Sequence, residues 1–379
     1  MSFLMTVKVK TLTNVNIQIV WTSVRDTNYL GPDTFCDYID MASRLLPDIV
    51  ATCTDDALSG TKFSSSDNFN ISDPLSRTQF QLQAMRMGKV WSLISQRRLR
   101  EVSVAILDDG IDFRDPDLAS SRGIFTTSRG HVITGYWDVV HDTGRPFITG
   151  NHGSDVARVM AARANNSFGV AGVASNLRLM SINVFGNSTT FYFSDLMEGL
   201  ELAIDIGIEV ISLSLGMKLD SWPEETRLGL QRKFLLKKAL DRAGEKDIIV
   251  VSAAGNYGMN DPDIFPCAYR GYNSICVGAL EKPDFISPYS NYGPQVHLAA
   301  FGTDIPVGFN GDGSIRSVTG TSFATPPFEI KPLLMRYSTP IHWPSRIIHR
   351  HGGALDVYHT IQGAIAEAAI YKVISRRDS

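Results

Sequence analysis

The sequence predicts an α/β protein built on a mainly parallel sheet that is buried on both faces. Short apolar runs recur in the middle of the chain, and several of them lack the polar alternation of a half-exposed strand. They cover residues 102–107, 177–185, 210–215, 247–254 and 274–280. Segments with helical spacing, such as 194–206 and 225–243, lie between them. Strands that alternate with helices and are apolar on both sides are typical of a parallel sheet covered by helices.

The length and composition agree with a globular protein of that class. The chain has 379 residues, which suits one large catalytic domain with an appendage or two average domains. Hydrophobic residues make up 44% and charged residues 20%, which excludes global disorder and a coiled coil. The net charge is only −3, and no stretch approaches the roughly 18 apolar residues of a membrane span. We therefore expect neither nucleic acid nor a membrane as a partner.

The N-terminus and the cysteines bear on location. Residues 1–21 contain no unbroken apolar stretch of the kind found in a signal peptide, so an intracellular location is favoured, although location stays open. The four cysteines, Cys36, Cys53, Cys267 and Cys276, form no CxxC pair, which leaves a zinc site unsupported. We expect reduced thiols. Pairing of Cys267 with Cys276 is the alternative in an oxidising compartment.

The chain divides into three parts by its patterns. Residues 7–21 alternate between apolar and polar side chains, which predicts one half-buried strand or a hairpin turning near Asn14. A helix is expected over 35–46, a polar linker over 54–76, and a further helical stripe over 80–94. The predicted parts are an N-terminal region at 1–76, a large domain at 77–345 and a helical tail at 346–379.

Three polar segments carry the residue types of a nucleophilic enzyme. Asp108 ends the run 102–107, His152 opens HGSDVA, and Ser322 lies in GTSFATP. Taken alone, each residue could have a purely structural role as a helix cap, a loop residue or a turn former. Together they supply a hydroxyl nucleophile, a base within reach of it, and a carboxylate that fixes the tautomer of the base.

Two further segments support this interpretation. Asn256 follows the apolar run 247–254, where its amide can donate to the oxyanion of a tetrahedral intermediate. The alternative is that Asn256 only makes a turn. Ser214, Leu215 and Gly216 lie at a strand end, where an extended peptide can pair with the chain as an added strand.

At this point the sequence resembles the subtilisin-like serine proteases, the subtilases. The matching stretches are VAILDDGID, HGSDVA, NNSFGVAGVA, ISLSLG, VVSAAGN, SPYSNYG and GTSFATP, which occur in the family's order over residues 85–326. The Asp–His–Ser order is that of subtilisin. The resemblance implies a three-layer sandwich with a mainly parallel doubly wound sheet, here with a small N-terminal α+β region.

The resemblance also implies an activity and a role for each site residue. The implied activity is that of a serine endopeptidase, a hydrolase that cleaves protein or peptide substrates. Asp108 matches the catalytic aspartate, His152 the base, Ser322 the nucleophile and Asn256 the oxyanion donor, while Ser214, Leu215 and Gly216 match the substrate-binding strand. Asp109 is then a neighbour, and Asp112 serves the following turn. The alternative is a catalytically impaired subtilase fold that binds or regulates.

Two departures from the family pattern lead to further expectations. Asp155 stands where the family usually has a second histidine, and Arg158 where it has a glycine. We expect Arg158 to be partly buried and paired with Asp155, one helical turn earlier. After Pro326 the sequence is unlike the family, and Pro332 would break a helix. We therefore expect no continuous buried helix over 327–345. Divergence and a gene-model error remain open, and a helix near 355–375 is a candidate replacement.

Cofactors and the N-terminal region leave alternatives open. Residues 165–174, NNSFGVAGVA, resemble a loop that holds calcium in some subtilases, largely through backbone carbonyls. We assign no metal or other cofactor and keep calcium as an alternative. The first 76 residues are compatible with a chaperone-inhibitor pro-region or with a fragment of an adaptor domain. Cleavage specificity and oligomeric state are not predicted.

Overall fold

The computed structural model describes residues 6–12, 17–23, 71–95, 100–174, 176–218, 227–260, 264–269, 271, 273–282 and 285–328. The chain divides into two compact units, residues 1–64 and 65–379. In the first unit, strands β1 (Thr6–Leu12) and β2 (Ile17–Ser23) pair antiparallel from Thr6↔Ser23 to Leu12↔Ile17. The hairpin alternative is therefore correct. The helix expected over 35–46 lies outside the described residues, as do Cys36 and Cys53.

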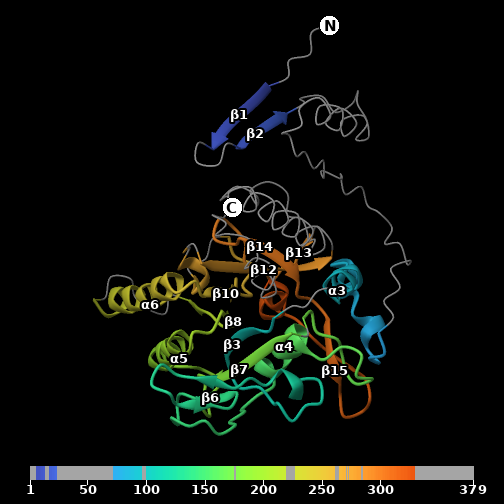
Figure 1. Ribbon diagram of the computed structural model, residues 1–379, viewed down its shortest axis with the longest axis vertical. Helices are drawn as coiled ribbons and strands as arrows, with labels where there is room; N and C mark the ends of the chain where they lie inside the picture. The colour runs from blue at the N-terminus through green and yellow to red at the C-terminus, as the bar shows by residue number, and fades with distance from the viewer. Residues whose placement is uncertain are drawn as a thin grey trace, which may run out of the picture. The chain divides into compact units, whose positions relative to one another are not determined.

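The second unit contains an eight-stranded sheet in the order β13-β12-β10-β8-β3-β7-β6, with β14 also paired to β12 (Figure 1). The strands are β3 (Val102–Asp108), β6 (Tyr136–Asp138), β7 (Leu177–Asn183), β8 (Val210–Leu213), β10 (Ile249–Ala253), β12 (Ser274–Lys282), β13 (Phe285–Ile286) and β14 (Leu298–Phe301). Every pairing is parallel except that of β12 with β13. All five predicted strands are present, in one sheet.

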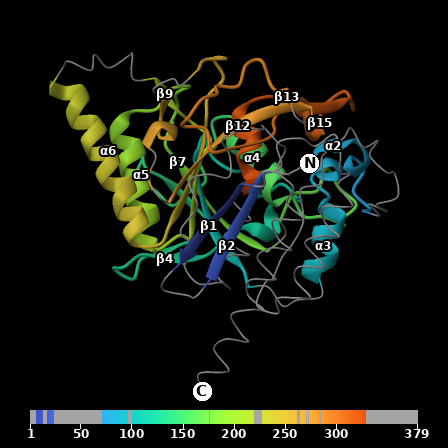
Figure 2. The same ribbon diagram turned by 90° about the horizontal axis from the view of Figure 1, so that it is seen from above.

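Helices cover both faces of this sheet (Figure 2). Helices α3 (Met87–Ser95), α4 (His152–Ala161) and α7 (Thr321–Ala324) pack on one face, and α5 (Phe193–Ile206) and α6 (Arg227–Glu245) on the other. Along β3, Val104 and Ile106 point into the first core, whereas Ala105 and Leu107 point into the second. Because both faces are buried, the strand lacks polar alternation, as the sequence predicted.

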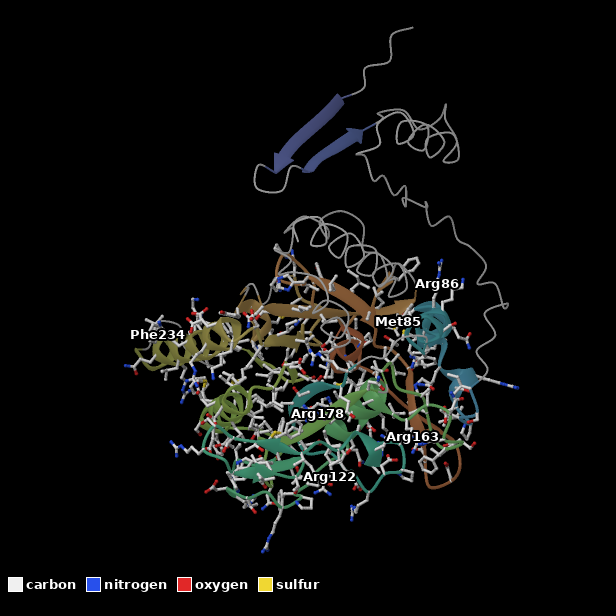
Figure 3. All side chains as sticks on the ribbon, viewed as in Figure 1. Met85, Arg86, Arg122, Arg163, Arg178 and Phe234 are labelled. Carbon is white, nitrogen blue, oxygen red and sulfur yellow. A yellow bond between two sulfur atoms is a disulfide. The ribbon has the colours of Figure 1, made fainter. Side chains whose placement is uncertain are left out.

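The helical stripe over 80–94 forms two helices instead of one. Turn η1 (Ser76–Thr78) and helix α2 (Phe80–Ala84) precede α3, and Figure 3 shows Met85 and Arg86 at the break. Arg86 has φ of 55°, a left-handed conformation that ends a right-handed helix. Met85 is buried at the break. Hydrophobic spacing predicts the burial of Met87 in α3, but it is wrong for α2, where Phe80 is exposed and Gln81 and Leu82 are buried. It also carries no information about one reversed torsion.

Part of the predicted linker 54–76 belongs to the second unit. The Asp73 carboxylate accepts hydrogen bonds from the backbone N–H groups of Asn165 (2.7 Å) and Asn166 (3.0 Å). The N–H of Leu75 donates to the carbonyl of Gly169 at 3.2 Å, and Leu75 is buried. The polar composition of 71–76 therefore reflects side chains that hold a neighbouring loop, not only solvated linker.

Short antiparallel strand pairs and 3-10 turns are further elements of the described part of the chain. They are β4 (Phe125–Thr126) with β5 (Val132–Ile133), β9 (Met217–Lys218) with β11 (Ile264–Phe265), β15 (Ile305–Phe309) with β16 (Ile315–Val318), and the turns η2 (Ala119–Ser121), η4 (Cys267–Tyr269) and η5 (Pro326–Phe328). None of the helices among the described residues is both long enough and apolar enough to cross a bilayer.

The cysteine expectation is wrong for Cys267 and Cys276, which form a disulfide. Cys267 begins η4 and Cys276 lies on β12, so the turn is cross-linked to the neighbouring strand with a Cα–Cα distance of 4.9 Å. Both residues are buried in a small cluster with Ala254. The two cysteines are nine residues apart in the sequence, and this spacing alone did not show that η4 packs against the start of β12.

The segment after Ser322 is described only as far as Phe328. Helix α7 has four residues, and the 3-10 turn η5 follows it directly. The start of the segment is therefore a short helical turn that Pro326 and Pro327 continue as 3-10 structure. The absence of a helix over 327–345 remains a prediction for residues beyond 328, and the helix near 355–375 lies outside the described residues.

Candidate active site

One edge of the sheet gathers the predicted site. Asp108 ends β3, Ser214 to Gly216 follow β8, and Asn256 comes three residues after the end of β10. These strands are neighbours in the order β10-β8-β3 and run parallel, so their carboxyl ends meet at the same edge. His152 begins α4 and Ser322 lies in α7, and both helices pack on the same face of the sheet.

Asp108 and His152 form a direct pair. Both carboxylate oxygens of Asp108 lie 2.9 Å from Nδ1 of His152. Asp108 is 1% exposed, whereas the side chain of His152 is 38% exposed. A carboxylate at Nδ1 holds the proton on that nitrogen and leaves Nε2 as the atom that can accept a proton. This half of the predicted constellation is assembled.

Asp109 binds the backbone at the start of the helix that carries His152. Its Oδ2 accepts the backbone N–H of His152 at 3.1 Å, and its Oδ1 accepts that of Gly153 at 2.7 Å. It therefore caps the N-terminus of α4 from another segment of the chain. Burial and the charge of Asp108 raise the pKa of Asp109 to about 6, although the two backbone hydrogen bonds oppose this. Sequence reasoning missed the cap, because the two partners are 43 and 44 residues away.

Three carboxylates near His152 act on the pKa of its imidazole. Burial alone would lower the pKa of the imidazole, but the charge and hydrogen bond of Asp108 outweigh it. The charges of Asp109 and Asp155 add to this, and together the acids raise the pKa of His152 to about 9. The acids therefore favour the protonated imidazole at neutral pH, and the neutral fraction that can act as a base grows as the pH rises.

Ser322 is buried and bonded to the end of β8. Its Oγ donates to the carbonyl oxygen of Ser214 at 3.1 Å, and Oγ of Ser214 donates back to the carbonyl oxygen of Ser322 at 3.0 Å. The structure has no hydrogen bond between Ser322 and His152, both of which are described. The next residue, Phe323, lies against the histidine, with ring centroids 5.4 Å apart. The segment that carries the serine thus contacts His152 through Phe323, but the hydroxyl of Ser322 faces Ser214.

Asn256 is oriented by the residue before the serine. Its Oδ1 accepts hydrogen bonds from the backbone N–H and from Oγ1 of Thr321, both at 2.9 Å. Thr321 Oγ1 in turn accepts the N–H of Gly255 at 3.1 Å. These contacts identify the oxygen end of the amide. A side chain at Gly320, whose φ is 157°, would come within 3.3 Å of Asn256 Nδ2, so the backbone passes close to the amide donor.

A cleft of about 850 Å³ opens beside the pair of Asp108 and His152. Ser214, Leu215 and Gly216 line it, as the resemblance implied, and aromatic side chains form much of the remaining wall. The aromatic residues are Phe185, Phe191, Tyr192, Phe193 and Tyr257. Ser322 does not line the cleft, since its hydroxyl turns to the Ser214 carbonyl.

The loop over 165–174 is held by side chains from two other segments. The buried Asp117 carboxylate accepts the side-chain amide of Asn166 (2.8 Å) and the N–H of Val170 (3.0 Å), and Gln79 bonds both backbone groups of Ala171. Burial raises the pKa of Asp117 to about 6. The described residues contain no cluster of three His, Cys, Asp or Glu side chains suited to a metal. These oxygens accept hydrogen bonds from N–H groups. Calcium binding at this loop stays an untested alternative.

Two expectations about neighbouring residues are confirmed. Arg158 is partly buried, and its Nη1 donates to Asp155 at 2.6 Å. Its Nε donates to Asp115 at 2.7 Å, a second acid that the sequence did not indicate. Asp112 serves the following turn, because its Oδ1 accepts the N–H of Arg114 at 3.0 Å.

Comparison with known proteins identifies the family. The model of the subtilase family matches residues 100–327, which is more than half of the chain, so the chain belongs to the subtilases. Thermitase from Thermoactinomyces vulgaris is 32% identical over 259 residues, which cover 68% of this chain and 82% of thermitase. A thermophilic serine proteinase from a Bacillus species (strain AK1) is 34% identical over 223 residues, 59% of this chain and 49% of that protein.

A solved structure supports the same fold. A protease from Pseudoalteromonas arctica superposes with a TM-score of 0.60 at 20% identity, covering 78% of this chain and 99% of that one. The subtilisin-like α/β architecture predicted from the sequence is therefore confirmed. The chain spans about half of the length of the Bacillus relative and about four fifths of thermitase.

Proposed function

We propose that this protein is a serine endopeptidase that hydrolyses peptide bonds in protein or peptide substrates. The observation that supports this most is the pairing of both Asp108 oxygens with Nδ1 of His152 at the edge where Ser214 and Asn256 also lie. A family relative that is named as a thermophilic serine proteinase supports the reaction class. A substrate peptide would lie along Ser214 to Gly216 as an added strand.

In the proposed reaction, Ser322 Oγ leaves the carbonyl of Ser214 and turns toward Nε2 of His152. This needs at least a rotation of the Ser322 side chain, and apo enzymes commonly have loose catalytic hydrogen bonds. His152 takes the hydroxyl proton as Oγ attacks the substrate carbonyl, and later gives it to the leaving amine. Asp108 stabilises the imidazolium, while Nδ2 of Asn256 and the N–H of Ser322 donate to the oxyanion.

Hydrolysis of a quenched fluorescent peptide library tests the proposal. The wild-type chain should cleave members of the library, with turnover increasing from pH 7 to pH 9 as the imidazole loses its proton. The matched variants are Ser322→Ala and Ser214→Ala, which each remove one hydroxyl from the reciprocal pair. Only the first should abolish cleavage, and equal activity of wild type and Ser322→Ala would refute the proposed nucleophile.

A catalytically impaired binding protein is the second candidate. The bond from Ser322 Oγ to the Ser214 carbonyl favours it, because a hydroxyl held there is not activated by His152. The four-residue length of α7 points the same way. Under this alternative the cleft binds a peptide without cleaving it. Peptide binding by wild type and Ser322→Ala with equal affinity, and with no product, would support this second function.

A further inference from the structure

A partly buried chain of ion pairs lies beside the histidine helix. Arg316 donates from Nη1 to Asp155 Oδ2 at 2.6 Å, and from Nη2 to Oδ1. Asp155 also accepts Nη1 of Arg158 at 2.6 Å, and Arg158 reaches Asp115 through Nε at 2.7 Å. The order is therefore Arg316–Asp155–Arg158–Asp115, with two positive and two negative groups. The exposed fractions of these side chains are 27%, 4%, 17% and 9%.

The chain of ion pairs connects the three segments that carry the proposed catalytic residues. Asp155 and Arg158 lie on α4, which begins at His152. Asp115 lies in the segment that follows β3, seven residues after Asp108. Arg316 lies on β16, which ends at Val318, four residues before Ser322. A fork of two hydrogen bonds from an arginine to a carboxylate has a defined geometry, so these contacts fix orientation as well as distance.

Asp155 also acts on the histidine through its charge. The groups that set the protonation of His152 are Asp108, Asp109 and Asp155, and each of these acids favours the imidazolium. Arg316 and Arg158 sit against Asp155 and partly offset its negative charge. Removal of Asp155 and removal of Arg316 should therefore move the pKa of His152 in opposite directions.

We propose that Asp155 is a positioning residue for the hydrolytic reaction, and that Arg316, Arg158 and Asp115 hold it in place. Asp155 aligns the helix of His152 with the segment that leads to Ser322. This inference rests on the proposed function. Asp155 and Arg158 stand where the family pattern has a histidine and a glycine, so the ion pair between them is a departure from that pattern.

The experiment compares pH profiles of kcat/KM for the full-length protein and its variants. Asp155→Asn should move the acid limb down by about half a pH unit, because one negative charge near His152 is lost. Arg316→Gln should move it up by a similar amount. In both variants kcat should fall roughly tenfold while KM changes little, because alignment of the reacting groups loosens.

Three further variants keep the inference falsifiable. Arg316→Lys retains the charge but not the fork, so its acid limb should stay at the wild-type pH while kcat remains reduced. The double variant Asp155→Asn/Arg316→Gln should return the limb to near its wild-type position. Arg114→Gln removes an exposed pair with Asp112 on the neighbouring turn and should change neither quantity, since Arg114 is 84% exposed.

The possible failures are distinguishable. A wild-type chain that cleaves no peptide would overturn the proposed function and this inference with it. An active wild type whose acid limb stays unshifted in both Asp155→Asn and Arg316→Gln would overturn the inference alone. Losses of kcat with unshifted limbs, accompanied by a lower melting temperature, would assign the ion pairs a purely structural role and would also overturn it.

Discussion

The histidine side and the serine side of the site are held by different kinds of interaction. His152 is surrounded by acids: Asp108 at Nδ1, Asp109 at the N-terminus of its helix, and Asp155 one turn along. The hydroxyl of Ser322 itself contacts only an uncharged residue, since Ser322 exchanges hydrogen bonds with Ser214. From this difference we expect that changes of pH, and substitutions that change a charge, alter the activity mainly through the histidine. The serine side should respond mainly to changes in hydrogen bonding and shape.

The largest expected effect comes from either end of the proposed proton transfer. Ser322→Ala and His152→Ala should each lower kcat for peptide hydrolysis by about 10⁴ or more, since one removes the nucleophile and the other its base. The double variant should be no worse than either single variant, because the two side chains act as one unit. Additive losses, measured by steady-state kinetics, would mean that the two sides of the site do not cooperate.

The oxyanion donor should give the next largest effect. Asn256→Ala should lower kcat by about 10²–10³ with little change in KM, the magnitude known for one such donor in subtilisin, a member of this family. Asn260→Ala is the matched control, because Asn260 is exposed and lies four residues along the chain. A change in KM alone would show instead that Asn256 contacts the substrate only in the ground state.

The dependence of kcat/KM on pH reports on the carboxylates around His152. A base must be neutral, so kcat/KM should rise with pH and level off above about 9, the pKa of His152. Asp109→Asn removes one acid that raises this pKa, so the rise should move to lower pH by roughly half a unit. Asp142→Asn, an exposed acid, serves as the control. An acid limb near pH 6.5 in the wild type would contradict the acidic environment described for His152.

The smallest effect should come from a hydrogen bond next to Ser322, on the serine side of the site. Thr321→Val keeps the shape of the side chain but removes the hydroxyl that joins Gly255 to Asn256. The N–H of Gly255 would lose its partner, so the free energy of unfolding should fall by about 1–3 kcal/mol, measured by chemical denaturation. The pH limb of kcat/KM should not move. A shift of that limb would show that the Thr321 hydroxyl also affects the pKa of His152.

The sequence predicted the parts of the site that local pattern determines. Asp108 and Asn256 follow apolar runs, and parallel strands bring their ends together, so convergence at one edge followed from strand order. The pair of Asp155 and Arg158 followed from helical spacing. Asp115 and Arg316 could not be predicted as partners, since they approach α4 from segments 43 and 161 residues away.

Other features lie beyond local pattern for a different reason. The break between α2 and α3 depends on a single left-handed torsion at Arg86, which apolar spacing does not encode. The disulfide of Cys267 and Cys276 depends on the packing of η4 against the start of β12. The rotamer of Ser322 depends on which acceptor is nearest in the folded state, and the structure selects the Ser214 carbonyl.

The central claim is that His152 activates Ser322 although the hydroxyl faces Ser214. Labelling with a fluorophosphonate probe, followed by mass spectrometry of the adduct, tests this most directly. We expect one adduct per chain at Ser322, formed faster at pH 9 than at pH 7, slowed strongly in His152→Ala and absent from Ser322→Ala. Absence of an adduct on the folded wild-type chain, or equal labelling of wild type and His152→Ala at both pH values, would contradict the account.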